Sequence, residues 1–585
     1  MKILNSIKYA CLAGALGISF TSCNDFLDRP NEDNYNVDTF YTTDEQCYMG
    51  VNYLYNSPWY DFQRGFIKMG EVLSGNFYWG SSPYLDFSVN GTDQDLVSMS
   101  YSLWAVIGHA NTVYRNLGNA EGPSQEAKDI CRGECLTWKA MAYFYLVRAF
   151  GEVPIIHDNA EEIASGTYND KYKVVREDVY EYIIMTLEEA MKLLPTQGQK
   201  GRLDYYSAEA LLAKVYLAKA GLGMSGSRNQ SDLDAAAKYA KDVIDNSGRN
   251  LLPVYSDIFR MQNNDNEEAL ISWKWSAGRD PWTQQNTLQS DLAPTGFDEF
   301  GDNWGGWNGL SVDLQDAFGV DVINTSPDAR IDTDTRRKAT MMLPGDLYEY
   351  FWTDKGGFDP LRFCYDPEDY GKGGPGEWQS ATGTMCVKHL YGDTYDHVQA
   401  LGTSPDNMAY GLATHILRLA DVYLIYAEAV LGNNASTSDG NALQAFNAVR
   451  SRAIPTATPK TSITFDDVWK ERRLELAMEG DRWFDYVRRS YYDMNACIEE
   501  LTSQRRNSYW NLGSLYKYYY ENGVWDVSKA ADTEGTGEAG YDTTTAAPKV
   551  TTDSFTLPFP TEDVVFNPHL MEPAISVDVR EVYAY

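Results

Sequence analysis

Residues 204–220 read DYYSAEALLAKVYLAKA, and this stretch decides the fold. Its apolar side chains recur at intervals of three and four residues in two adjacent stripes, which consist of Leu211, Val215 and Ala218 and of Leu212 and Tyr216. A helix that is apolar on two sides must lie between neighbouring elements. The next predicted helix contains DAAAKYA at 234–240, whose small side chains let helices approach closely. The pattern predicts stacked helix pairs similar to tetratricopeptide units.

Helical periodicity occurs in two groups of segments along the 585 residues. The predicted helices span 131–150, 176–194, 205–222 and 233–244 in the first group, and 415–431, 441–452 and 465–488 in the second. Between about 251 and 411 the periodicity disappears and Gly, Asp, Asn, Pro and Trp become frequent, which is typical of functional loops. A second irregular stretch, about 490–550, is predicted to be an exposed insertion.

These patterns predict a mainly α protein. No Pro/Ser linker or abrupt change of composition divides the chain, so residues 23–585 are expected to form a single body. Its helical scaffold would comprise about 38–250 and 412–490, and the irregular region of about 251–411 would carry the ligand.

The amino terminus resembles a secretory signal. Lys2 and Lys8 precede or flank an apolar run that is too short to span a bilayer, and Phe20-Thr21-Ser22-Cys23 follows. Small residues before a cysteine are typical of a lipobox, which predicts removal of residues 1–22 and lipidation of Cys23. The alternatives are an ordinary signal peptide with an incidental cysteine, or an intact membrane anchor.

Charge and motif content exclude several classes of function. The net charge of −34 disfavours nucleic acid and anionic lipid as partners, because both require a basic surface. No H-E-x-x-H or G-x-S-x-G motif occurs, so neither a catalytic residue nor a metal or cofactor is predicted. Cys131 and Cys135 fit neither a C-x-x-C redox motif nor a zinc signature, and are predicted to be buried thiols. GKGGPG at 371–376 does not follow an apolar strand, which indicates a loop rather than a dinucleotide site.

Aromatic residues in Gly- and Asn-rich loops are the candidate ligand-binding residues. Sugar rings have apolar C–H faces and polar rims, so a glycan site needs flat aromatic platforms with amide, hydroxyl or guanidinium groups at their edges. Two segments supply this mixture. The candidates are Asn76, Tyr78 and Trp79 in the first segment, and Trp282, Asn303, Trp304 and Trp307 in the second; Tyr78, Arg362 and Tyr391 are weaker candidates than the tryptophans.

Several segments, in this order, resemble the SusD/RagB family of Bacteroidetes outer-membrane lipoproteins. They are CNDFLD at 23–28 with Pro30, WKAMAYFYLVRAFGEVP at 138–154, RLADVYLIYAEA at 418–429, NAVRSR at 447–452, ERRLELAMEGDRWFD at 471–485, and LPFP at 557–560 with Asn567-Pro568. Most of these segments are consistent with scaffold. Gly151 and Pro154 would end a helix, and the spacing of Arg472, Glu475, Glu479 and Arg482 predicts ion pairs on one helical face rather than a catalytic carboxylate pair.

The resemblance implies a non-catalytic lipoprotein of the outer membrane, anchored through Cys23, that binds a glycan and delivers it to a TonB-dependent SusC-like barrel. It also implies ligand aromatics in a loop after the first helix and in the central irregular region. Three alternatives stay open at this point: a peptide-uptake member of the family, a surface glycoside hydrolase, and an interaction scaffold without a small ligand.

Overall fold

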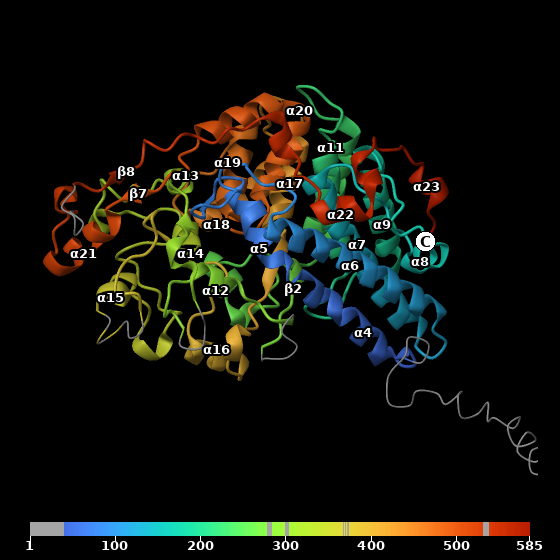
Figure 1. Ribbon diagram of the computed structural model, residues 1–585, viewed down its shortest axis with the longest axis horizontal. Coiled ribbons are helices and arrows are strands. Elements are labelled where there is room, and N and C mark those ends of the chain that lie inside the picture. The colour runs from blue at the N-terminus through green and yellow to red at the C-terminus, as the bar shows by residue number, and fades with distance from the viewer. Residues whose placement is uncertain are drawn as a thin grey trace, which may run out of the picture.

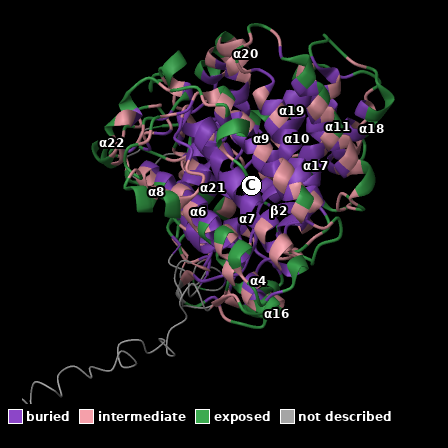
Figure 2. Ribbon diagram, turned by 90° about the vertical axis from the view of Figure 1, so that its right-hand side faces the viewer, coloured by how far each residue is buried: buried purple, intermediate pink, exposed green. Residues whose placement is uncertain are grey.

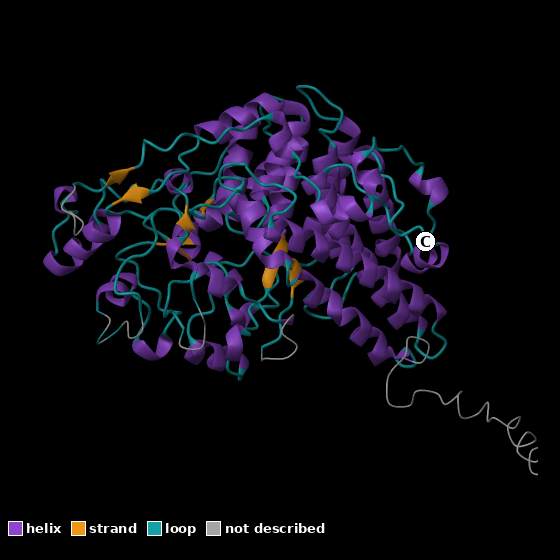
Figure 3. Cartoon of the chain, viewed as in Figure 1, coloured by secondary structure: helices purple, strands orange, loops and turns teal. Residues whose placement is uncertain are grey.

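The computed structural model describes residues 40–277, 284–298, 303–366, 368, 370, 374–530 and 537–585. The predicted signal peptide, Cys23, Trp282 and residues 371–373 lie outside these ranges. The described chain is mainly α, as the sequence predicts (Figure 3). No helix among the described residues is long and apolar enough to cross a membrane.

The scaffold is a continuous stack of helices that occupies the right and the upper middle of Figure 1. Its first members are α6 (Gln94–Asn119), α7 (Gln125–Phe150), α9 (Arg176–Leu193), α10 (Tyr205–Lys219) and α11 (Gln230–Asn246), and its later members are α17 (Leu419–Leu431), α18 (Gly440–Ala453), α19 (Phe465–Leu476) and α20 (Arg482–Ser503). Each helix from α6 to α11 packs against the next of these, and α11 packs against α17. The α11–α17 contact therefore joins the two helical groups into one body.

The ends of α10 and α7 show why local sequence locates these helices. Asp204 caps the amino terminus of α10 in a reciprocal capping box with Ser207. Helix α7 ends at Phe150 because Gly151 has a φ of 77°, and an added Cβ there would meet the Arg176 guanidinium. Cys131 and Cys135 on α7 are buried free thiols, as predicted.

Two predicted helices are wrong in part. Residues 414–418 form a strand, β6 (Thr414–Arg418), before α17 begins, and β6 pairs antiparallel with β2 (Ala269–Trp273). The predicted helix at 465–488 is broken between α19 and α20, where Met478 and Gly480 both have positive φ. This break lets the backbones of Gly480 and Gly70 approach so closely that a Cβ on Gly70 would collide with Gly480.

The central region contains short elements joined by irregular chain, on the left of Figure 1. They are α12 (Leu288–Leu292), η7 (Gly305–Trp307), β3 (Gly309–Leu310), α13 (Val312–Ala317), α14 (Thr335–Thr340), β4 (Met341–Met342), α15 (Pro360–Tyr365), β5 (Met385–Cys386) and α16 (Thr394–Leu401). Many of their side chains are buried, and Figure 2 shows how the buried core extends through the molecule.

The stretch after the scaffold differs from the predicted insertion. Helix α20 continues to Ser503 through a kink at Asp493, beyond the expected start of the insertion at about 490. Helix α21 (Leu512–Asn522) buries Leu515 and Tyr516, and Tyr516 packs edge-to-face against Trp378 of the central region. This part of the segment is therefore packed against the body, because its apolar side chains find partners there.

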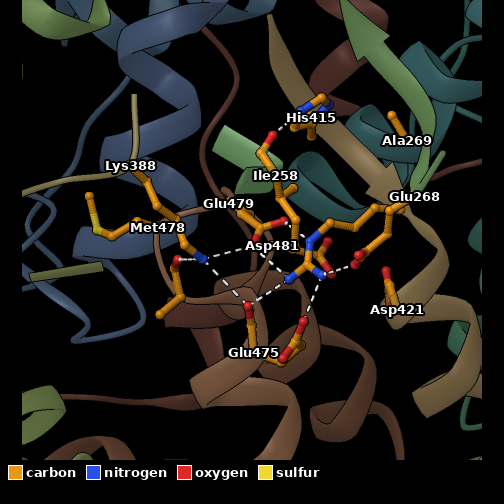
Figure 4. Close-up of polar contacts among 12 residues, drawn as sticks. Ile258, Glu268, Ala269, Lys388, His415, Asp421, Glu475, Met478, Glu479 and Asp481 are labelled. Atoms are coloured by element: carbon orange, nitrogen blue, oxygen red, sulfur yellow. Dashed lines mark hydrogen bonds and ion pairs between the residues drawn. The ribbon is translucent and has the colours of Figure 1, made fainter. Parts of the chain in front are cut away.

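A buried cluster of charges joins the scaffold to the central region. Arg418, at the end of β6, donates from Nη1 to Glu268 and to Glu475 at 2.6 Å each, and from Nε to Glu479 at 2.7 Å. Lys388 donates to Glu479 at 2.8 Å, and Figure 4 shows Glu268, Lys388, Glu475 and Glu479 converging from different segments. All these side chains are at least nine-tenths buried, so each charge depends on its partners.

We expect Arg418→Met to destabilise the protein by about 3–5 kcal/mol, because it leaves three buried carboxylates without their shared guanidinium. Urea unfolding followed by circular dichroism measures the free energy of unfolding. The matched control is Arg505→Met, whose exposed pair with Asp316 predicts a loss below about 1 kcal/mol. Equal, small losses in both variants would contradict a structural role for the cluster.

Candidate aromatic binding site

The two aromatic segments that the sequence singles out lie side by side. Strand β1 (Phe77–Tyr78) pairs antiparallel with β3, with Phe77 opposite Leu310 and Tyr78 opposite Gly309. The contact continues where the Ser311 backbone N–H donates to the Asn76 carbonyl at 2.9 Å, and the Ser311 hydroxyl to the Gly75 carbonyl at 2.5 Å. This two-residue pairing therefore brings the loop after β1 next to the loop that contains η7.

Trp304 and Trp307 have the exposure expected of ligand platforms. Their side chains are 42% and 60% exposed, on a loop whose Gly305 and Gly306 are buried. A Cβ on Gly305 would collide with the Asp291 carbonyl, and one on Gly306 with the Gln379 side chain. The two glycines thus let the loop lie directly on its support, while the indole rings face outward.

Trp304 is oriented by a buried carboxylate. Its indole N–H donates to Asp291 Oδ1 at 2.6 Å, and Asp291 also accepts from the Arg64 Nε at 3.1 Å. Asp291 is buried in α12, whereas half of the Arg64 side chain on α5 (Phe62–Ile67) is exposed. A guanidinium with free surface thus lies beside an indole platform, both held by one carboxylate.

Trp79 and Tyr78 are half-buried at the edge of this surface. The Lys68 ammonium lies 4.7 Å from the centre of the Trp79 ring, and Lys68 also forms an ion pair with Asp95. Phe77 packs edge-to-face against Trp79. The cation and the neighbouring ring hold the Trp79 side chain in place.

Three residues that the sequence predicts to contact a ligand are buried in the structure. Asn76 is fully buried: its Nδ2 donates to Glu71 at 2.9 Å and its Oδ1 accepts from Arg473 at 2.9 Å, so it supports the loop instead of contacting a ligand. Tyr391 is buried and donates to Asp298, which makes it a core residue. Asn303 is also buried, next to Trp304.

Arg362 is half-exposed, with its guanidinium over the Tyr370 ring at 4.2 Å. Sequence reasoning missed Arg64, Lys68 and Asp291. The spacing of four residues between Arg64 and Lys68 puts both on one side of a helix before the first aromatic loop, and this signal was available in the sequence. Nothing local distinguishes Asp291, because its role depends on partners from other segments.

Glu475 and Glu479 do not form a catalytic pair. Burial alone would raise the pKa of Glu475, but the guanidinium groups of Arg452, Arg418 and Arg336 lower that pKa to about 2. Burial likewise opposes ionisation of Glu479, but Arg418 and Lys388 lower its pKa overall. Carboxylates held ionised inside the core can neither donate a proton at neutral pH nor reach a substrate. Their partners come from other segments, so the predicted pairing along one helical face is wrong.

The fold and this surface define a class of protein: a helical scaffold that presents aromatic platforms for binding. Among the described residues, no group of three or more His, Cys, Asp or Glu side chains is arranged to hold a metal ion. The available groups at the surface are indole faces, a phenol, a guanidinium and an ammonium. Such groups bind a ligand through stacking and hydrogen bonds.

Comparison with known proteins identifies the family. The model of the SusD family matches residues 274–573, and a model described as starch-binding associating with outer membrane matches residues 25–217. A SusD-like protein of Bacteroides ovatus is 33% identical over 99% of this chain and 100% of its own length. The chain therefore belongs to the SusD family.

Solved structures share the fold. A crystal structure with xylogluco-oligosaccharide has a TM-score of 0.73 and 30% sequence identity, and covers 92% of this chain and 99% of that one. A laminarin binding SusD-like protein has a TM-score of 0.61 over 90% of this chain and 98% of its own; at 22% identity it shows the fold alone.

We expect Gly305→Ala to destabilise the protein by about 1–3 kcal/mol, because the added methyl group must displace the Asp291 backbone or the loop. Thermal and urea unfolding measure the change. Gly440→Ala, at the start of α18, is the control: nothing lies within 4 Å of its added Cβ, so its stability should be unchanged or slightly higher. A neutral Gly305 variant would show that the loop is not tightly seated.

Proposed function

We propose that this protein binds an oligo- or polysaccharide on the surface formed by Trp304, Trp307, Tyr78 and Trp79. The observation that carries the proposal is the exposure of two indole rings on a loop seated by buried glycines, with the Arg64 guanidinium alongside. The xylogluco-oligosaccharide in the 30% identical structure supports this ligand class.

The proposed mechanism is binding without bond cleavage. The C–H faces of sugar rings would lie on Trp304 and Trp307, and Arg64 would donate hydrogen bonds to hydroxyl groups at the ring edge. The surface is open and excludes little water, so affinity for a single short oligosaccharide should be weak to moderate. A long glycan would gain affinity by contacting several platforms at once.

We further propose that Cys23 carries the lipid anchor, that the protein faces the cell exterior, and that it passes its glycan to a TonB-dependent SusC-like barrel. The lipobox before Cys23 and the family description as associating with the outer membrane support this arrangement. In this arrangement the lipid holds the protein at the membrane, and the aromatic surface concentrates glycan close to the importer.

We expect Trp304→Ala/Trp307→Ala to abolish retardation in affinity electrophoresis by the glycan that retards wild-type residues 24–585. Each lost platform removes stacking, so calorimetry should show at least roughly tenfold weaker binding. The control is Trp510→Ala, because Trp510 is also 42% exposed but lies on β7 (Tyr509–Trp510). Unchanged glycan binding in the double variant would refute the assignment, and binding of peptides alone would favour a peptide-uptake protein.

We expect the intact chain to incorporate radioactive palmitate and to fractionate with the outer membrane, and Cys23→Ala to lose the label. Affinity purification from detergent-solubilised outer membranes of the native host should co-purify a TonB-dependent barrel. Cys11→Ala, in the predicted signal, is the matched control and should keep the label. Labelling that persists without Cys23, or recovery of the protein alone, would contradict the proposed anchor or partner respectively.

A further inference from the structure

An aromatic-lined cavity of about 570 Å³ is built from residues outside the site around Trp304. Its aromatic walls are Trp104 on α6, Tyr168 in the loop after α8 (Asn159–Ser165), and Phe559 and Phe566 near the carboxy terminus. Phe566 ends α22 (Thr561–Phe566). Figure 1 shows α8 and α22 on the right and α12 and α13 on the left, so this cavity is separate from the site around Trp304. Its volume falls within the range of about 300–1,000 Å³ that is usual for ligand sites.

The inner walls of the cavity are fixed by packing. Phe559 stacks on Phe150 at 5.4 Å with an angle of 9° between the rings, and Trp104 packs edge-to-face against Tyr143. The Leu557 backbone N–H donates to the Ala149 carbonyl at 2.8 Å, which ties this segment to the end of α7. The cavity is therefore a preformed part of the scaffold.

The rim of the cavity consists of two exposed rings. Tyr168 and Phe566 are 64% and 71% exposed, although both are large and apolar in the body of the ring. Leaving such rings in water at the mouth of a preformed cavity is typical of a binding surface. The packed walls and the exposed rim together resemble the arrangement around Trp304 and Trp307.

The polar groups at the cavity edge suit a neutral, hydroxyl-rich ligand. Asn567 donates from Nδ2 to the Lys171 carbonyl at 2.8 Å, and its Oδ1 has no hydrogen-bond partner among the described residues. Of the two charged groups, Lys171 pairs with Glu162, whereas the Asp563 carboxylate accepts a hydrogen bond from the neutral Ser100 hydroxyl. The cavity therefore offers amide and carboxylate oxygens as acceptors for the hydroxyl groups of a ligand.

Another cavity lies directly beside the first. A second cavity, of about 530 Å³, shares Phe559 and Leu570 with the first, and its wall includes Lys173 and Arg176. The shared residues form a ridge between the two spaces. A ligand of several rings in a row fits this shape better than a single compact molecule.

We propose that the groove between Trp104, Tyr168, Phe559 and Phe566 is a second saccharide-binding site, which takes a neutral oligosaccharide. It rests on the proposed function only in its choice of ligand class. Tyr168 and Phe566 contact the apolar faces of the sugar rings from both sides of the rim. Asn567 and Asp563, at the edge of the cavity, accept hydrogen bonds from hydroxyl groups of the ligand.

The test measures binding of three probes to residues 24–585 by saturation-transfer NMR and calorimetry. The probes are a xylogluco-oligosaccharide, laminarihexaose and maltoheptaose. Tyr168→Ala/Phe566→Ala should weaken binding at this groove roughly tenfold and lower the number of ligands bound per protein. Trp304→Ala/Trp307→Ala should leave binding at the groove unchanged. The control is Tyr101→Ala/Val565→Ala, which replaces an aromatic and an apolar residue that are 67% and 72% exposed but do not line the cavity. Because all four residues are exposed, the melting temperature of both variants should match wild type.

The outcomes separate the two sites. If Trp304→Ala/Trp307→Ala has no effect but Tyr168→Ala/Phe566→Ala lowers binding, the groove is a saccharide site and the proposed principal site is not. If no probe loses binding in Tyr168→Ala/Phe566→Ala, including the case in which no probe binds at all, the groove is not a saccharide site. A loss in the control variant of equal size would also overturn the proposal.

Discussion

The structure depends on the sharing of Arg418 by three buried carboxylates. Glu268 precedes β2, whereas Glu475 and Glu479 lie at the end of α19 and in the following turn, so one guanidinium ties the central region to the helical scaffold. Burial of these charges is costly, and only complete pairing offsets that cost. Arg336 and Arg452 complete the pairing of Glu475, and Lys388 that of Glu479. The arrangement favours a single relative position of scaffold and central region.

This cluster also supports the aromatic surface through a continuous set of contacts. The chain turns after Glu479, and the Gly480 backbone N–H donates to Glu71 at 2.8 Å. Glu71 accepts from Asn76, and Asn76 accepts from Arg473 of α19. Asn76 in turn precedes β1, whose pairing with β3 places Tyr78 beside the loop of Trp304. The rigid core thus determines where the exposed rings lie, which lowers the entropic cost of binding a flexible glycan.

The residues proposed to contact a ligand are exposed, whereas the residues that hold those contact residues in place are buried. Trp304 and Trp307 keep large exposed faces, while Asn76, Asp291 and Glu71 are buried and use their polar atoms on neighbours. Trp104 and Phe559 are likewise packed walls, in contrast to the exposed Tyr168 and Phe566. Both surfaces therefore combine a stiff base with an exposed rim; α8 and α22 lie on the right of Figure 1, and α12 and α13 on the left.

The sequence by itself determined the helices, because the periodicity of Leu211, Val215 and Ala218 and the caps at Asp204 and Gly151 act within a few residues of chain. It also determined that tryptophans occur in a glycine-rich central loop. Only the tertiary structure decided which of the polar neighbours are buried, since Asn76 and Tyr391 find their partners on distant segments. The break at Met478 and Gly480 has the same origin: Glu71 and Gly70 lie about 400 residues away in the chain, and local periodicity contains no information on such contacts.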